Sequence, residues 1–306
     1  MFDMIIIGAG TAGLTAAIYG LRAGLSVVVL EEFIYGGQIA NTPDVENYPG
    51  IEKISGADFG ITLYEQAKKY GALIKFEGVK NIKLTGQVKE VSTNKTTYQG
   101  KTVIIANGAK RRKLGCKGEE EFSGRGVSYC ATCDGAFYKG KEVVIVGGGN
   151  TAVEDALFLA NNCQKVHVVH RRDSFRASQV LVDSLKAREN IIIHYDSVVE
   201  EISGTKSVER AIIKNLKDNT ATELTISGVF VAVGLEPDNS IYQSEILLDK
   251  NGYIQAGENC KTNVEGVYAA GDTRTKTLRQ LVTAAADGAV AAFEAGNYIN
   301  QMQIQA

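Results

Sequence analysis

The sequence predicts an α/β fold built on two copies of a strand, glycine loop, helix and strand. In the first copy the apolar run Met4–Ile7 leads into Gly8-Ala9-Gly10-Thr11-Ala12-Gly13, and in the second Val143–Val146 leads into Gly147-Gly148-Gly149-Asn150-Thr151-Ala152. The first glycine and the end of the second strand are 23 residues apart in both copies, and the copies are offset by 139 residues. This domain-sized offset indicates one duplicated β-α-β unit rather than a solenoid of short repeats.

The composition is that of an ordinary globular protein of about two domains. The chain has 306 residues, with 33 Lys and Arg against 35 Asp and Glu, so it has no basic excess for a nucleic-acid backbone. No apolar run approaches the roughly 18–20 residues that span a bilayer. The start MFDMIIIGAG lacks the basic region of a signal peptide. We therefore expect a cytoplasmic protein that binds neither nucleic acid nor membrane.

The elements of the first half follow from short apolar runs. After Gly13 a helical pattern continues to Gly24, and a second strand, Val27–Leu30, ends at Glu31-Glu32. The polar, alternating stretch from Thr85 to Gly100 predicts a hairpin or meander. A further buried-type strand, Val103–Ala106, precedes Gly108.

The second half repeats this organisation. After the second glycine loop a helix is predicted through Ala160, and then a strand, Val166–Val169, that ends at His170-Arg171-Arg172. Two more buried-type strands, Val229–Val233 and Val267–Ala270, end at Gly234 and at Gly271-Asp272. A final helix is predicted from about Leu281 to Tyr298.

The first glycine loop predicts a dinucleotide site. It follows a strand and opens a helix, so its glycines let the backbone approach a pyrophosphate and the helix N-terminus supplies free N–H groups. Glu31, at the end of the second strand, is placed to accept hydrogen bonds from a ribose 2′-hydroxyl. The site therefore favours an adenosine ribose without a 2′-phosphate.

The second glycine loop, of the form Gly147-x-Gly149-x-x-Ala152, has the opposite preference. Where the first copy has Glu31, the second has His170, followed by Arg171, Arg172 and later Arg176. Guanidinium groups match phosphate oxygens, so this cluster favours the 2′-phosphate of NADPH. A solvated basic strand end is the alternative. Two sites of opposite preference suit NADPH that passes hydride to a bound FAD.

The segment Cys130-Ala131-Thr132-Cys133-Asp134 is a CxxC motif, which is typical of half a zinc site or of a redox disulfide. The remaining cysteines, Cys116, Cys163 and Cys260, are isolated, so no second ligand pair for zinc is evident and no metal is expected. We interpret Cys130 and Cys133 as a redox pair and Asp134 as a group that exchanges protons with a thiolate, with a turn cap as its alternative role.

Together these motifs resemble the bacterial-type low-molecular-weight thioredoxin reductases, which are class II pyridine nucleotide-disulfide oxidoreductases. The resemblance covers essentially the whole chain. The segments that carry it are Gly36-Gly37-Gln38, Val45-Glu46-Asn47-Tyr48-Pro49-Gly50, Gly126-Val127-Ser128 with the CxxC motif, the second glycine loop, His170-Arg171-Arg172-Asp173, Ala270-Gly271-Asp272 and Arg279-Gln280.

The resemblance implies two Rossmann-like three-layer dinucleotide-binding domains, the second inserted into the first. An FAD-binding domain would comprise 1–112 and 241–306, and an NADPH-binding domain with the redox pair would comprise 113–240. It further implies a homodimer in which Cys130 attacks the thioredoxin disulfide, Cys133 faces the flavin and Asp134 handles protons. The residues expected to bind FAD are Gly8, Gly10, Thr11, Ala12, Gly13, Glu31, Glu32, Gly37, Gln38, Asn47, Val79, Ala106, Asn107, Gly108, Asp272, Arg279, Gln280 and Leu281. Those expected to bind NADPH are Gly147, Gly149, Asn150, Thr151, His170, Arg171, Arg172 and Arg176.

The chain departs from the family pattern in small ways. Asn107 stands where the family often has Thr, Cys116 is an uncommon thiol close to the expected domain boundary at 112–113, and we expect no added thioredoxin-like domain. Three other functions remain as alternatives: a ferredoxin-linked flavin reductase would lack the arginine cluster, a ferredoxin–NADP reductase would lack the CxxC, and a flavin-binding redox sensor would need no 2′-phosphate cluster. The sequence also leaves open whether a glutaredoxin-like protein is the acceptor.

Overall fold

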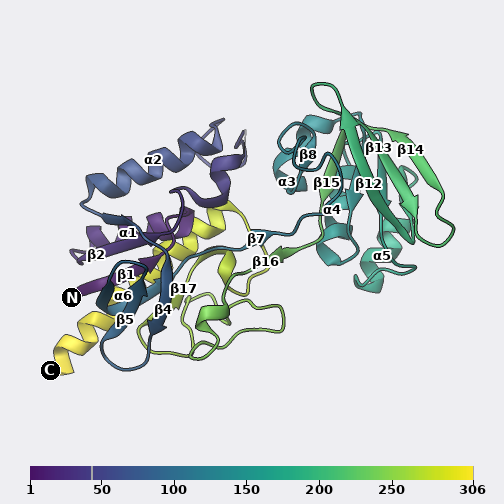
Figure 1. The fold of residues 1–306 in the computed structure, drawn as a ribbon. Helices are drawn as coiled ribbons and strands as arrows, with labels where there is room; N and C mark the ends of the chain where they lie inside the picture. The colour runs from purple at the N-terminus through teal and green to yellow at the C-terminus, as the bar shows by residue number, and fades with distance from the viewer. Residues whose placement is uncertain (43, 306) are drawn as a thin grey trace. The chain divides into compact units, whose positions relative to one another are not determined.

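The structure is a computed structural model that describes residues 1–42 and 44–305. The chain divides into two compact units (Figure 1). The outer unit comprises Met1–Lys110 and the segment from Glu236 onward, and the inserted unit comprises Arg111–Leu235. At this division β7 (Lys110–Arg111) pairs with β16 (Leu235–Glu236) in a two-stranded sheet.

The outer unit is built on a seven-stranded sheet in the order β3-β2-β1-β6-β5-β4, with β17 also on β6. The long strand β6 pairs with β5 through its first residues and with β17 through its last, while β1 runs parallel on its other side. The antiparallel pair of β5 and β6 confirms the hairpin predicted between Thr85 and Gly100. The strands are β1 (Phe2–Ile7), β2 (Val27–Glu31), β3 (Leu73–Phe76), β4 (Val79–Lys83), β5 (Lys89–Thr93), β6 (Thr97–Ile105) and β17 (Val267–Ala269).

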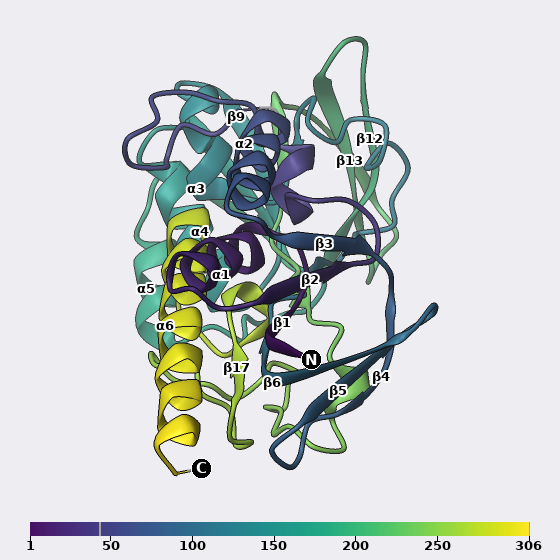
Figure 2. The same ribbon diagram turned by 90° about the vertical axis from the view of Figure 1, so that its left-hand side faces the viewer.

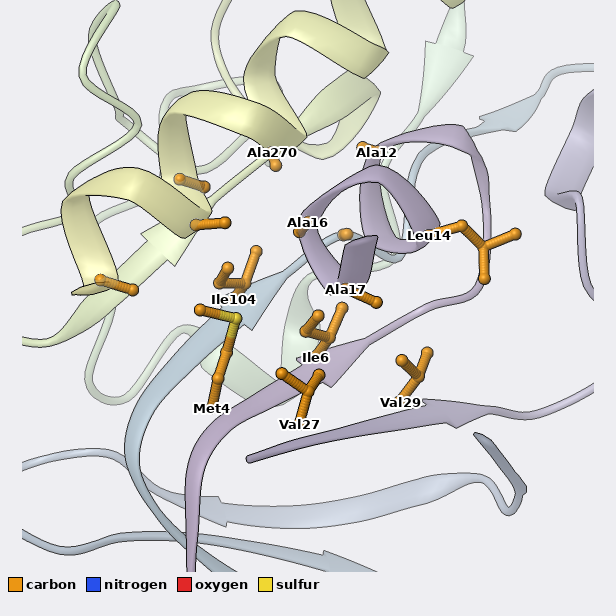
Figure 3. Packing of buried hydrophobic residues seen from close by; sticks show 14 of the residues in the cluster. Met4, Ile6, Ala12, Leu14, Ala16, Ala17, Val27, Val29, Ile104 and Ala270 are labelled. Atoms are coloured by element: carbon orange, nitrogen blue, oxygen red, sulfur yellow. The ribbon is translucent and has the colours of Figure 1, made fainter. Parts of the chain in front are cut away.

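One face of this sheet is covered by α1 (Thr11–Arg22) and α6 (Leu281–Gln305), which lie side by side (Figure 2). Met4, Ile6 and Ile104 project from the strands toward Ala16 and Ala17 of α1, and small side chains let the two helices approach (Figure 3). The helix α2 (Gly56–Lys69) packs beside α1. Short 3-10 turns of this unit are η1 (Gly37–Asn41), η3 (Ser240–Tyr242) and η4 (Gly271–Thr273), and η2 (Gly135–Tyr138) belongs to the inserted unit. The predicted last helix is correct in place but continues beyond Tyr298.

The opposite face of the outer sheet carries a second apolar cluster. Tyr242, Ile246 and Ile254, from the segment after β16, pack there against strand residues such as Ile5 and Val28. The sheet is therefore buried on both sides, which explains why its central strands read as continuous apolar runs rather than as alternating ones.

The inserted unit has the same plan with a different outer layer. Its sheet has the order β11-β10-β9-β15-β8 and all its pairs are parallel. Helix α4 packs on one face and the antiparallel sheet β12-β13-β14 on the other. The elements are β8 (Val127–Ser128), α3 (Ala131–Asp134), β9 (Glu142–Val146), α4 (Asn150–Ala160), β10 (Lys165–Val169), α5 (Gln179–Lys186), β11 (Ile191–His194), β12 (Ser197–Gly204), β13 (Val208–Asn215), β14 (Ala221–Thr225) and β15 (Gly228–Val231). The predicted fold class, two Rossmann-like units, is confirmed.

Candidate dinucleotide sites and redox pair

The first glycine loop forms a tight backbone cradle between β1 and α1. Gly8 has φ +103°, and a Cβ there would lie 2.4 Å from the Ala106 carbonyl oxygen. A Cβ on Gly13 would lie 1.9 Å from the Gly8 carbonyl oxygen. Gly10, in contrast, lies in open space. It is the N-cap of α1, no described side chain forms a capping hydrogen bond there, and an added Cβ would meet no described atom closer than 3.9 Å. The cradle fits a pyrophosphate, because open space lies where the first N–H groups of α1 emerge.

Glu31 stands beside this cradle with its carboxylate held in place. Its Oε2 accepts a hydrogen bond from the Ala9 N–H at 2.7 Å, and its Oε1 accepts one from the Phe33 N–H at 2.9 Å. Each oxygen keeps a further lone pair for a ribose hydroxyl. Glu32 points elsewhere, because its Oε1 lies 3.1 Å from the Lys80 Nζ, next to Val79 at the start of β4.

The segment after β2 returns over the loop. Gly36 and Gly37 have φ of +89° and +69°, values that favour glycine, and the Gly36 N–H donates to the Ala9 carbonyl. Further along, the Asn47 Nδ2 donates to the Gln280 Oε1 at 3.2 Å. Two residues that the resemblance assigned to the flavin from opposite ends of the chain are thus in contact, while Gln38 is exposed on η1.

The side chain of Asn107, at the end of β6 between Ala106 and Gly108, is engaged by protein groups. Its Oδ1 accepts from the Thr273 Oγ1 at 2.9 Å, and its Nδ2 donates to the Asp238 carbonyl at 2.9 Å and to the Asn239 Oδ1 at 3.1 Å. This network ties the returning chain to the carboxyl end of the sheet. Any contact of Asn107 with a flavin would therefore have to come from its backbone.

The turn that carries Asp272 is anchored by a residue that sequence reasoning missed. Asp287 of α6 accepts hydrogen bonds from the Gly271 N–H at 2.8 Å, from Arg274 at 2.8 and 2.9 Å, and from the Lys276 Nζ at 2.8 Å. Burial alone would raise the pKa of Asp287, but hydrogen bonds from Arg274 and Lys276 outweigh it and hold the pKa below its usual value. The sequence feature that could have revealed Asp287 is its position as a single acidic residue in an alanine-rich helical segment.

Arg279 carries a buried donor without a hydrogen-bond partner among the described residues. Its guanidinium lies over the Tyr253 ring at 4.2 Å, and its Nη2 makes one long hydrogen bond, of 3.4 Å, to the Arg274 carbonyl. Its Nε is buried and has no hydrogen-bond partner among the described parts of the chain. A buried donor of this kind is normally paired, so an acceptor on a bound cofactor fits it. Leu281 follows as the first residue of α6.

The second glycine loop repeats the cradle in the inserted unit. A Cβ on Gly147 would lie 2.5 Å from the Ala232 carbonyl oxygen, whereas one on Gly149 would meet no described atom within 4 Å. Gly149 caps α4, and Asn150 and Thr151, both exposed, form its first turn. The Asn150 Oδ1 accepts from the Ser178 N–H at 2.9 Å. The loop again leaves room where N–H groups emerge.

The predicted phosphate cluster separates into a buried histidine and exposed arginines. The His170 ring packs beneath Gly148, whose Cβ would lie 2.1 Å from it, and the His170 Nε2 is 2.9 Å from the Ser174 carbonyl oxygen. Burial lowers the pKa of His170, and Arg172 and Arg176 lower it further, so the ring is neutral at pH 7. Arg171, Arg172 and Arg176 are exposed. His170 therefore shapes the loop, and the cationic surface comes from the arginines.

Cys130 and Cys133 form a disulfide at the start of α3, as expected of a redox pair. Both are half-buried, and the Cys133 N–H donates to the Cys130 Sγ at 3.2 Å. The Asp134 carboxylate accepts a 2.6 Å hydrogen bond from the Ser128 hydroxyl. A backbone N–H aimed at sulfur favours a thiolate on Cys130 after reduction.

The other three cysteines are free thiols. Burial, with a smaller contribution from Glu119, raises the pKa of Cys116 to about 11, and burial also raises the pKa of Cys163 and Cys260. All three are protonated and unreactive at neutral pH. The described residues contain no group of three or more His, Cys, Asp or Glu that could hold a metal ion. Within the same residues, no helix is long and apolar enough to cross a membrane.

Known proteins are similar to this chain over nearly its whole length. Residues 2–288 match the family described as pyridine nucleotide-disulphide oxidoreductase. Thioredoxin reductase from Listeria monocytogenes is 43% identical over 99% of this chain and 95% of its own, and that from Bacillus subtilis is 42% identical over 99% and 96%. The crystal structure of thioredoxin reductase from Streptococcus pyogenes superposes with a TM-score of 0.94 at 42% identity, covering 98% of this chain and 99% of the other. The chain therefore belongs to the pyridine nucleotide-disulphide oxidoreductase family, among the low-molecular-weight thioredoxin reductases that its motifs resemble.

Proposed function

We propose that this chain reduces the disulfide of thioredoxin through Cys130, Cys133 and Asp134. The observation that carries the proposal is the half-buried disulfide with a backbone N–H on the Cys130 Sγ and an aspartate fixed next to it. The enzyme class is confirmed by the thioredoxin reductases that match almost the whole chain. The role of each residue and the identity of the acceptor form the proposal.

The thiol chemistry follows from this arrangement. In the reduced pair the Cys130 thiolate attacks one sulfur of the thioredoxin disulfide, forms a mixed disulfide and expels a thioredoxin thiolate. The Cys133 thiol then gives up its proton and its sulfur attacks the Cys130 Sγ. This step restores the Cys130–Cys133 disulfide and releases the second thioredoxin thiolate. Asp134 takes the proton of Cys133 and passes it to one of the two thioredoxin thiolates; the other takes its proton from water.

Thioredoxin reductases of this family use FAD and NADPH, in agreement with the predicted cofactors. Bound FAD supplies the means of carrying two electrons from NADPH to the disulfide. We assign FAD to the outer unit. The cradle of Gly8–Gly13 matches its pyrophosphate, and the Glu31 carboxylate matches its ribose hydroxyls. The buried Arg279 Nε matches a hydrogen-bond acceptor of the cofactor. The remaining residues predicted for FAD belong to this proposal.

We assign NADPH to the inserted unit. The loop Gly147–Thr151 holds its pyrophosphate, and Arg171, Arg172 and Arg176 hold the 2′-phosphate, since all three residues are exposed and follow β10 and His170, whose ring supports the loop. The arginine cluster speaks against a ferredoxin-linked reductase, and the disulfide speaks against a ferredoxin–NADP reductase.

The homodimer and the cytoplasmic location are also proposed. Exposed apolar side chains of the outer unit, among them Phe293 at 66% and Tyr19 at 52%, supply apolar surface for a second copy. The three free thiols suit a reducing compartment. Sedimentation equilibrium of the purified holoenzyme measures the oligomeric state, and a monomer at micromolar concentration contradicts the dimer.

The test of the function is NADPH oxidation by the holoenzyme with oxidised thioredoxin, with a glutaredoxin and with neither. Cys130→Ser and Cys133→Ser are each expected to abolish thioredoxin reduction and to leave NADPH-driven bleaching of the flavin intact. Cys133→Ser is expected to trap thioredoxin as a mixed disulfide through Cys130. Cys163→Ser, which removes a buried thiol outside the disulfide, is the matched control. Substantial turnover in either active-site variant, or faster turnover with the glutaredoxin, contradicts the proposal.

A further inference from the structure

We propose that Ser128 is a positioning residue for the redox pair and acts by holding the Asp134 carboxylate; this inference rests on the function proposed above. The Ser128 hydroxyl donates to the Asp134 Oδ2 at 2.6 Å and accepts from the Cys130 N–H at 3.1 Å. One hydroxyl thus joins the proton-handling carboxylate to the backbone of the attacking cysteine.

The geometry assigns the single proton of the hydroxyl to Asp134. The Cys130 carbonyl oxygen is the other acceptor within reach, at 3.3 Å, and the shorter contact to an ionised carboxylate is the stronger one. With the Cys130 N–H as its donor, the Ser128 oxygen is satisfied in both directions. The hydroxyl is therefore held in one orientation, and Asp134 is held with it.

Ser128 is itself rigidly placed. It is 5% exposed and is the last residue of β8, which pairs with β15 opposite Phe230. The chain before it is fixed by Gly126, where φ is +120° and a Cβ would lie 2.6 Å from the Val208 side chain. The chain after it is fixed by the Tyr129 hydroxyl, which donates to the buried Glu119 at 2.9 Å. A strand end anchored on both sides supports a hydrogen bond that must persist through turnover.

The elements around Asp134 carry further titratable groups. Cys133 belongs to the same helix, Cys130 is its cap, and Tyr138 belongs to η2. Burial, followed by the Asp134 charge, raises the pKa of Tyr138 to about 12, so Tyr138 stays neutral in any assay below pH 9. Helix α4 packs on α3 and contributes Asp155, whose pKa burial raises to about 6.

The hydrogen bond has a defined chemical consequence. A donor to the ionised carboxylate favours the charged form, so its removal raises the pKa of Asp134 and loosens its position. The loosened carboxylate then accepts the Cys133 proton less readily. Hydrogen bonds to charged groups correspond to roughly a tenfold change or more in an equilibrium constant, which is about one pH unit.

The experiment compares Ser128→Ala, Ser128→Thr, Asp134→Asn and the double variant Ser128→Ala with Asp134→Asn, all as reduced holoenzyme. Two pH profiles are measured from pH 5 to 9: the single-turnover rate with thioredoxin, and the rate of Cys130 alkylation by iodoacetamide, followed by mass spectrometry. Alkylation needs neither thioredoxin nor turnover. Ser197→Ala is the matched control, because Ser197 is equally buried in the same unit and its hydroxyl donates to the Tyr195 carbonyl at 2.7 Å.

Ser128→Ala is expected to shift both profiles and to slow the single-turnover reaction at pH 7 about tenfold, because the Asp134 carboxylate is no longer held in place. Ser128→Thr keeps the hydroxyl and should restore the profile, and Ser197→Ala should match the wild type. In the Asp134→Asn background the same change should alter either rate less than twofold, because Ser128 acts through that carboxylate.

An unshifted profile in Ser128→Ala, or an undiminished effect in the Asp134→Asn background, overturns the proposal. If Ser128→Ala fails to fold by circular dichroism, Ser128→Gly removes the same hydroxyl and is held to the same outcomes. A wild-type enzyme that is inactive with thioredoxin refutes the proposed function, while the alkylation profiles still decide the role of Ser128.

Discussion

Asp287→Asn is expected to destabilise the outer unit strongly. The three side chains of this buried ion cluster, Asp287, Arg274 and Lys276, are 8%, 3% and 5% exposed. The substitution keeps the size of the side chain but leaves two buried cations without their carboxylate. Breaking a buried pair in this way costs about 3–5 kcal/mol, which corresponds to an increase of about two to four powers of ten in the opening equilibrium.

The assay uses a thiol built into the same cluster. The Cys260 side chain is fully buried and its Sγ lies 3.6 Å from the Asp287 carbonyl oxygen, so it reacts only when this region opens. Its labelling rate under native conditions, resolved by mass spectrometry from the other thiols, measures that opening. Glu258→Gln is the control, because Glu258 is fully exposed and 3.9 Å from the Arg274 Nη2, and no measurable change is expected.

The pH dependence gives a second check. The pKa of Asp287 is held below 3.8, so the stability it contributes is complete above about pH 4 and is lost as the pH falls through the folded-state pKa. The difference between wild type and Asp287→Asn should be constant from pH 5 to 8 and should shrink below about pH 4. A Cys260 labelling rate within twofold of the wild type at pH 7 refutes the reasoning.

Three further predictions concern the inserted unit. Arg171→Gln and Arg172→Gln should each lower the preference for NADPH over NADH about ten- to a hundredfold, since charge-assisted hydrogen bonds are worth about 1.5–3 kcal/mol; an unchanged ratio of kcat/KM values would place the phosphate elsewhere. Asp155→Asn should stabilise the protein by about 3 kcal/mol above pH 6. Burial raises the pKa of Asp155 from 3.8 to about 6, so this gain should vanish as the pH falls to about 4, and urea denaturation at the two pH values checks it. Gly148→Ala should destabilise the unit because its Cβ would lie 2.1 Å from the His170 ring, whereas Gly149→Ala, with no described atom within 4 Å, should keep the melting temperature and weaken NADPH binding.

The glycine loops show why much of this protein could be predicted from its sequence. Gly8, Gly13 and Gly147 stand where a Cβ would overlap the backbone, and such positions exclude every other residue type. Strand, turn and helix follow one another within about 30 residues, so their signals are local. The CxxC motif is local for the same reason, since three residues of spacing suffice to bring its two sulfurs together.

The contacts that tune the sites depended on tertiary structure. Asn107 was predicted as a cofactor contact, but its side chain forms hydrogen bonds with Thr273 and Asn239. His170, predicted as part of a phosphate cluster, supports Gly148 from below. Both outcomes depend on which side chains the packed strand ends bring within reach, and a residue's type and local spacing do not specify those neighbours.

The sequence by itself determined the fold class, the two glycine loops and the disulfide between Cys130 and Cys133, because each rests on backbone requirements or on chemistry within a few neighbouring residues. Only the tertiary structure decided that Asp287 anchors the turn at Gly271 and that Ser128 holds Asp134. Asp287 lies 16 residues from Gly271, and the Ser128 hydroxyl reaches Asp134 only because β8 ends where α3 turns back. Hydrogen bonds of this kind form when burial removes water from both groups, so that each group can pair only with the other. Only the packing of the folded chain creates this condition.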